Sequence, residues 1–119
     1  MHEFSVCQHL LQQVEALARA HRARAVSRIR LQIGPLSGIE AVLLAHAFTV
    51  AGAGTVAEGA VLETESLPVR VHCKTCGADS AATPNRLLCG VCGDWHTDLL
   101  SGDEMLLTSV DLELEEDDV

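Results

Sequence analysis

Four cysteines in two pairs carry the strongest chemical signal in the chain: Cys73-Lys-Thr-Cys76 and, twelve residues later, Cys89-Gly-Val-Cys92. Two thiolates separated by two residues can hold one ion from a tight turn, and two such turns supply four soft ligands in a tetrahedron. The spacing therefore predicts a structural zinc site, with an iron tetrathiolate, a disulfide pair or a redox dithiol as the alternatives. Because four thiolates leave no open coordination position, we expect this site to support structure and perform no chemistry.

The first three residues, Met1-His2-Glu3, could hold a second kind of metal ion. A bulky residue at position 2 hinders removal of the initiator methionine, so a free α-amine remains at Met1. That amine, the deprotonated amide nitrogen of His2 and the His2 imidazole can form adjacent chelate rings, and Glu3 can add a fourth ligand. Nitrogen ligands in one plane suit square-planar Ni²⁺ or Cu²⁺. The other interpretation, a histidine at a frayed terminus, stays open from the residues alone.

Common catalytic signatures are missing from the sequence. It contains no G-x-x-x-x-G-K-[ST], G-x-G-x-x-G, G-x-S-x-G or H-E-x-x-H motif. The acidic residues Glu63 and Glu65 read as exposed strand positions, so paired acid/base carboxylates are not evident either. A catalytic Ser/His/Asp set brought together by folding stays open from the residues alone, but no motif indicates one.

The net charge limits the classes of partner that the protein is expected to bind. A formal net charge of −9 in 119 residues argues against nucleic acid, because phosphate binding needs a basic stripe. The longest apolar stretch, residues 41–53, is interrupted by His46 and Thr49 and is too short to span a bilayer. With paired Cys-x-x-Cys turns and no secretion signal at the start, the expected compartment is the reducing cytoplasm.

Alternating and helical patterns predict the elements that position these residues. Apolar spacing predicts a helix over 5–21, begun by a capping box at Ser5, and a second helix to about residue 50, begun by a capping box over 37–40. Alternation predicts strands over 27–33 and 104–115, and a long strand over 61–72 interrupted at Pro68. The order predicts an α+β fold in which two helices pack on one face of a three-stranded sheet.

The cysteine array falls between the last two predicted strands, so the main domain is discontinuous. We expect an α+β domain formed by residues 1–70 plus 101–119, with a zinc-ribbon-like module over 71–100 inserted into it. His72 and His96 flank the two cysteine turns; the simplest interpretation is local hydrogen bonding, and the alternative is a link between zinc geometry and pH. The terminal Glu115-Glu-Asp-Asp118 reads as a solvated acidic tail.

Five segments taken together resemble the HypA/HybF family of nickel metallochaperones for [NiFe]-hydrogenase maturation. They are Met1-His2-Glu3 leading into a helix, the run 28–40 (RIRLQIGPLSGIE), Ala57-Glu-Gly-Ala60, the two cysteine turns, and Ser101-Gly-Asp-Glu-Met105. The resemblance covers the chain except its acidic tail. One departure is Ala41-Val42, where relatives often have proline and an acidic residue.

The resemblance implies a nickel carrier. His2 becomes the principal Ni²⁺ ligand with the Met1 amine and Glu3 beside it, and Cys73, Cys76, Cys89 and Cys92 hold structural Zn²⁺. It also implies a GTPase accessory protein and the hydrogenase large-subunit precursor as partners. A homodimer stays open. The competing functions are a zinc-ribbon module that binds protein or RNA without nickel, and an electron carrier with iron at the cysteines.

Overall fold

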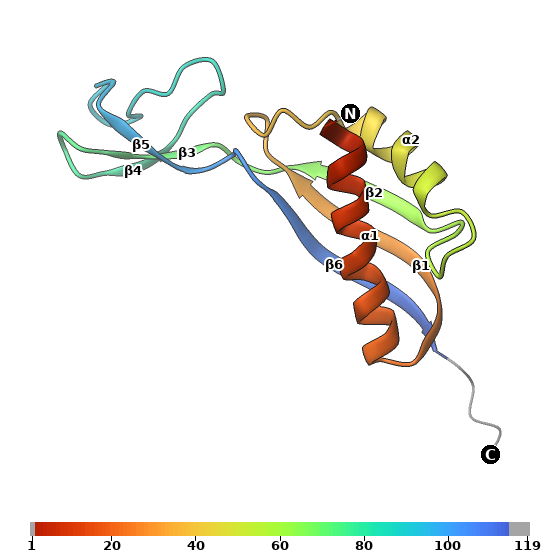
Figure 1. The fold of residues 1–119 in the computed structure, drawn as a ribbon. Helices are drawn as coiled ribbons and strands as arrows, with labels where there is room; N and C mark the ends of the chain where they lie inside the picture. Colours follow the sequence, from red (N-terminus) through yellow and green to blue (C-terminus); the bar gives the residue numbers. More distant parts are fainter. Residues whose placement is uncertain (1, 115–119) are drawn as a thin grey trace. The chain divides into compact units, whose positions relative to one another are not determined.

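The computed structural model describes residues 2–114, except for the side chain of His2 (Figure 1). Met1, the His2 imidazole and the acidic tail, all singled out above, lie outside the described part. The elements follow the order α1 (His2–Ala20), β1 (Ala23–Ile33), α2 (Ala41–Ala51), β2 (Val61–Ser66), β3 (Arg70–Cys73), β4 (Asp79–Ala81), β5 (Thr97–Ser101) and β6 (Met105–Leu114).

Two three-stranded sheets organise these elements, one in the order β2-β1-β6 and one in the order β4-β3-β5. Residue contacts divide the chain into two compact units. The first comprises the chain up to Leu31, Glu40–Thr64 and the chain from Leu107 onward; the second comprises Gln32–Ile39 and Glu65–Leu106. The functional division into nickel and zinc domains stays a prediction.

In the first unit, α1 and α2 cover one face of the β2-β1-β6 sheet (Figure 1). Leu17, which the apolar spacing also placed on the predicted stripe of α1, is 38% exposed, but four other members of the stripe are buried at helical spacing. They are Cys7, Leu10, Val14 and Ala18. On β1, Ile29 and Leu31 also have no exposed surface, and each such side chain contributes about 1.5–3 kcal/mol by leaving water. The predicted fold class, α+β with two helices on a three-stranded sheet, is confirmed.

The chain passes from β1 through α2 to β2 in a crossover connection. Arg30 on β1 bonds Glu63 on β2, and Gln32 bonds Glu65 two residues further along both strands. Because the bonded residues advance in the same direction along both strands, β1 and β2 are parallel. Parallel neighbours need a connection long enough to contain a helix. This connection places the start of α2 near the start of α1.

Both predicted capping boxes are wrong. Helix α1 already begins at His2, so Ser5 lies inside it. Helix α2 begins only at Ala41, and its N-cap residue Glu40 makes no side-chain cap. Ser37 instead accepts a hydrogen bond from the Ile39 amide at 3.1 Å, and this local turn competes with helix formation.

The predicted interruption at Pro68 is confirmed and separates the two sheets. Strand β2 ends at Ser66 and β3 begins at Arg70, where it pairs antiparallel with β4 and β5. The Ser101 hydroxyl donates to the Pro68 carbonyl at 2.7 Å, which ties the end of β5 to this interruption. The small sheet was not predicted, and it delivers Cys73 at the end of β3.

Candidate metal centre

The two cysteine turns share one backbone design. In the first turn, the Cys73 amide donates to the Ala78 carbonyl, and the Gly77 amide donates to the Cys73 carbonyl, both at 2.9 Å. The second turn repeats both bonds at the same spacing and length: the Cys89 amide donates to the Asp94 carbonyl, and the Gly93 amide donates to the Cys89 carbonyl. Gly77 and Gly93 have φ of 77° and 79°, a conformation that side chains with a Cβ rarely adopt. A glycine therefore suits the position after each cysteine pair.

This design aims backbone N–H groups at the first sulfur of each pair. The Cys76 amide lies 3.4 Å from the Cys73 sulfur, and the Val91 and Cys92 amides lie 3.3 and 3.4 Å from the Cys89 sulfur. Such donors favour the thiolate. They lower the pKa of Cys73, and those of Cys92 and Val91 lower the pKa of Cys89 to about 6.

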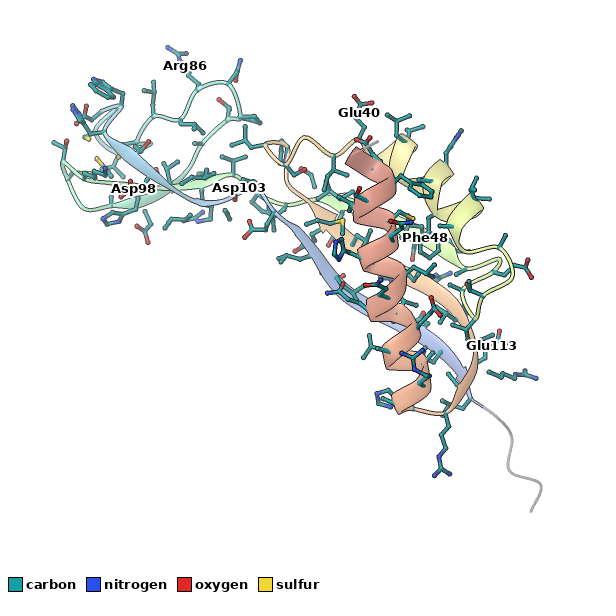
Figure 2. All side chains as sticks on the ribbon, in the orientation of Figure 1. Glu40, Phe48, Arg86, Asp98, Asp103 and Glu113 are labelled. Carbon is teal, nitrogen blue, oxygen red and sulfur yellow. The ribbon has the colours of Figure 1, made fainter. Side chains whose placement is uncertain are left out.

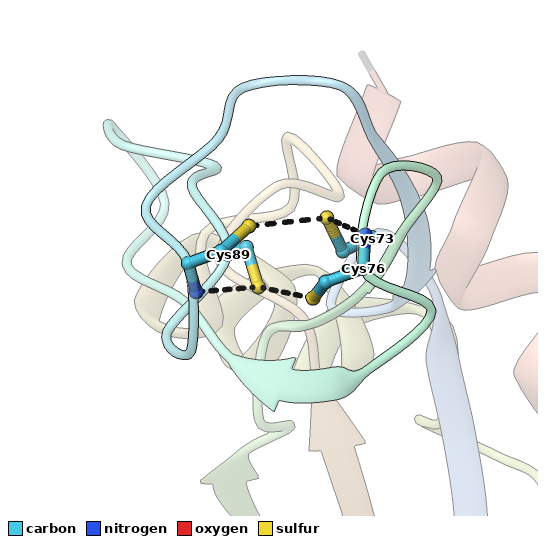
Figure 3. Close-up of side chains that lie close together, drawn as sticks. Cys73, Cys76 and Cys89 are labelled. Atoms are coloured by element: carbon cyan, nitrogen blue, oxygen red, sulfur yellow. Dashed lines mark hydrogen bonds between the residues drawn. The ribbon is translucent and has the colours of Figure 1, made fainter.

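All four sulfurs converge, as Figure 3 shows for the labelled cysteines. The Cys73 and Cys92 sulfurs are 3.6 Å apart, as are those of Cys76 and Cys89, and all four lie within 4.8 Å of one another. Four zinc–sulfur bonds of about 2.3 Å in a tetrahedron require sulfurs about 3.8 Å apart. The cluster therefore fits a structural metal ion such as zinc.

The second sulfur of each pair resists ionisation. At Cys92 the Asp94 amide favours a lower pKa, but burial and the three other sulfurs raise the pKa to about 12. At Cys76 the Ala78 amide acts in the same direction and is outweighed by the Cys89 sulfur, burial and the Cys73 sulfur, so its pKa is raised. Four adjacent thiolates thus need a cation to neutralise them, which a divalent metal supplies.

Asp94 joins the two turns. Its carboxylate accepts a short hydrogen bond from the Thr75 hydroxyl in the first turn and another from the Trp95 amide at 2.8 Å in the second. The Thr75 hydroxyl and His96 lower the pKa of Asp94 to about 2. The Lys74 amide adds a second link, because it donates to the His96 carbonyl at 2.8 Å. Asp94 was not among the predicted site residues, and its one signal in the sequence is its place just after the second cysteine pair.

The two histidines beside the turns bond carboxylates. His72 Nδ1 lies 2.6 Å from Asp79 Oδ1, and His96 Nδ1 lies 3.1 Å from Asp94 Oδ1. The His96 ring also stacks on Trp95, with ring centroids 3.8 Å apart. These contacts agree with the simpler interpretation, local hydrogen bonding.

Of the three predicted nickel ligands, Glu3 is the one whose side chain the structure describes. This residue lies in the first turn of α1, where a negative charge is favourable. Its Oε2 accepts a hydrogen bond from the backbone amide of Glu40 at 3.3 Å, and Glu40 is the N-cap residue of α2. The structure thus brings Glu3 to the beginning of α2, while Met1 and the His2 side chain lie outside the described residues.

Known proteins match this chain over nearly its full length. The family model described as "Hydrogenase/urease nickel incorporation, metallochaperone, hypA" matches residues 1–112. The hydrogenase maturation factor HypA of Nitrosospira multiformis is 47% identical over 112 residues, which cover 94% of this chain and 97% of that protein. The protein of the same name from Aquifex aeolicus is 41% identical over 115 residues, covering 97% and 100%.

Solved structures show the same fold. The solution structure of the Ni metallochaperone HypA from Helicobacter pylori matches with a TM-score of 0.73 and 25% identity, over 95% of this chain and 98% of that one. A second solution structure, of a HypA protein, matches with a TM-score of 0.76 and 26% identity, over 97% and 98%. Given these matches and its cysteine cluster, the chain belongs to the HypA family.

Proposed function

We propose that this protein is a nickel metallochaperone: it binds Ni²⁺ at its amino terminus and delivers the ion during maturation of [NiFe]-hydrogenase. The single observation that carries the proposal is the family match, which extends from the first residue through residue 112. A delivery protein needs an exchangeable site with open access, and a chelate at a chain terminus supplies one. The cysteine cluster cannot serve that purpose, because a closed site holds its ion. The protein is a carrier and not an enzyme.

The proposed nickel ligands are the Met1 amine together with the amide nitrogen and imidazole of His2. Glu3 completes or neutralises the site through its amide or its carboxylate. The bond between the Glu3 carboxylate and the Glu40 amide supports a positioning role, since it fixes the first turn of α1 beside α2. Nitrogen ligands in one plane favour nickel over zinc, which prefers a tetrahedron.

We assign Zn²⁺ to Cys73, Cys76, Cys89 and Cys92. The short distances between the sulfurs support a tetrahedral ion, and the two glycine turns support a closed site of fixed shape. The nickel domain in this proposal comprises residues 1–70 plus 101–119, and the zinc module comprises 71–100.

The proposed partners are a GTPase accessory protein of hydrogenase maturation and the hydrogenase large-subunit precursor, encountered in the cytoplasm. Among the described residues, no helix is long and apolar enough to cross a membrane. Self-association as a homodimer is compatible with this role. Delivery to a precursor requires only that the terminal chelate release nickel to a stronger site.

Nickel titration with two altered amino termini tests the proposal. His2→Ala removes the imidazole, and one added residue before Met1 keeps His2 but destroys the terminal-amine chelate. We expect each change to weaken Ni²⁺ binding at least tenfold, about 1.4 kcal/mol. His21→Ala, at the other end of α1, is the matched control and keeps wild-type affinity. Wild-type affinity in both altered termini would defeat the proposal.

A further inference from the structure

Helix α2 is apolar on two sides. Its inward residues Leu44 and Phe48 are buried in the core of the first unit. On the outside, Val42 and Val50 are 69% and 71% exposed, and Leu43 is 47% exposed. The helix contains no Asp, Glu, Lys or Arg. A helix that is apolar all round is normally covered on both sides, so its exposed side indicates a binding surface.

The exposed residues form one continuous face. Val42, His46 and Val50 lie four residues apart, Thr49 lies three residues after His46, and Leu43 flanks them. Residues at these intervals share a face of an α-helix. We call Val42, Leu43, His46, Thr49 and Val50 the outer stripe of α2.

A hollow of about 310 Å³ adjoins this stripe at the carboxyl end of α2. Phe48 and Thr49 of the helix line it together with Gly52, Ala53, Ala57 and Glu58. Most of the lining residues are glycine or alanine. Two hydrogen bonds hold its wall: the Gly54 amide donates to the Glu58 carboxylate at 3.1 Å, and the Thr55 hydroxyl donates to the Gly52 carbonyl at 2.7 Å. Thr49 belongs to both the stripe and the hollow. A preformed hollow beside an apolar stripe suits one anchoring side chain of a partner.

The charges around this surface indicate the charge of the partner that it can bind. Glu40 stands at the start of α2, as Figure 2 shows, and Glu58 stands at the hollow. The sequence has no Lys or Arg from Leu31 to Val69. A second copy of the chain would bring the same two carboxylates and a net charge of −9 to a surface that already carries them. Charge complementarity therefore favours a basic partner.

We propose that the outer stripe and the hollow bind an amphipathic basic helix of another protein. The apolar face of that helix packs on Val42, Leu43 and Val50, and its flanking Lys or Arg side chains face Glu40 and Glu58. One large apolar side chain enters the hollow. The surface contains neither the cysteines nor the three terminal residues assigned to nickel, so its failure would leave the proposed metal sites untouched.

A synthetic amphipathic helix, with leucines on one face and lysines on the flanks, is the probe. Fluorescence anisotropy gives its Kd for the full chain, and amide chemical shifts locate it. We expect shifts at residues 42–60, and a loss of at least about tenfold in affinity for Val50→Lys. Leu100→Lys is the matched control: it places a lysine at an apolar residue of β5 that is 49% exposed and belongs to neither cysteine turn, and it should alter Kd less than about twofold.

A second peptide with glutamates in place of the lysines tests the charge argument. It should bind at least about tenfold more weakly at low salt. Equal affinity for both peptides, shifts confined to other surfaces, or equal losses in the two variants would each overturn the proposal. So would sedimentation showing a wild-type dimer that Val50→Lys dissociates, because a second copy would then occupy this surface.

Discussion

Asp94 has a larger role than its place beside the cysteines suggested. One carboxylate accepts hydrogen bonds from Thr75 in the first turn and Trp95 in the second, and the backbone carbonyl of the same residue accepts from Cys89. Groups that orient metal ligands without touching the ion commonly decide how tightly the ion is held. Asp94 therefore fixes the separation of the two turns as well as the shape of the second.

Asp94→Asn should weaken zinc binding by about tenfold to a hundredfold, because the amide is uncharged and offers one acceptor oxygen in place of two. Competition with a chromogenic chelator measures this. Asp98→Asn is the control, since that exposed carboxylate contacts Lys74 at 3.2 Å and surface pairs contribute little. Equal zinc affinities in the two variants would show that Asp94 does not hold the turns together.

The low pKa of Asp94 also determines the pH range over which its ionised carboxylate stabilises the folded chain. It lies at about 2, below the ordinary value of 3.8, so the ionised carboxylate stabilises the folded chain above the ordinary value. That contribution is lost only as the pH falls toward about 2. Asp94 should therefore stay ionised from about pH 5 to 8, and any difference in zinc affinity between wild type and Asp94→Asn should be present throughout this range.

At the scale of elements, the end of β1 meets the segment before β6 with no room for a side chain. The Gly34 amide donates to the Glu104 carbonyl, and the Leu36 amide donates to the Gly102 carbonyl, both at 2.8 Å. A Cβ on Gly34 would lie 2.1 Å from the Gly102 carbonyl oxygen. Only glycine permits this approach of two backbones.

Gly34→Ala should accordingly lower the free energy of unfolding by about 1–3 kcal/mol or more, the usual cost of overpacking. Urea denaturation at saturating zinc measures the loss. Gly38→Ala provides the comparison, because its φ of 77° is strained but nothing lies within 4 Å of an added Cβ. Its cost should be smaller, about 1 kcal/mol. A larger loss for Gly38→Ala would contradict this account.

Periodicity predicted the large elements, but it could not locate their ends or the small sheet. Ile29 and Leu31 alternate with arginines, which identified the buried face of β1. Helix α2 began later than predicted because Ser37 forms a local turn instead of a cap. Strand β4 has three residues, too few for any pattern, and its pairing follows from the cysteine turn. Alternation predicted strand β6 but not how far its side chains are buried, since Leu106 and Leu114 are exposed.

The candidate zinc site was predictable because ligand spacing is a property of the chain itself. The link between the turns was not, because Thr75 and Asp94 are nineteen residues apart and meet only after folding. The contact between Glu3 and the Glu40 amide escaped prediction for the same reason. Sequence identifies groups with suitable chemistry, and packing decides which of them meet.

For the whole molecule, the cysteine cluster and the proposed nickel site have opposite requirements and belong to different compact units. The four cysteines lie in the second unit, where glycine turns and converging sulfurs give a closed site. The beginning of α1, where we propose an exchangeable nickel site, lies in the first unit. This separation allows a permanent ion and a transported ion to coexist, because each site offers ligands that the other metal disfavours.

X-ray absorption at the nickel and zinc edges of the doubly loaded protein tests this central claim most directly. We predict a nickel edge with nitrogen and oxygen neighbours alone, and a zinc edge with four sulfurs at about 2.3 Å that is unchanged by nickel. Sulfur around nickel, or loss of sulfur from the zinc shell when nickel is added, would contradict it.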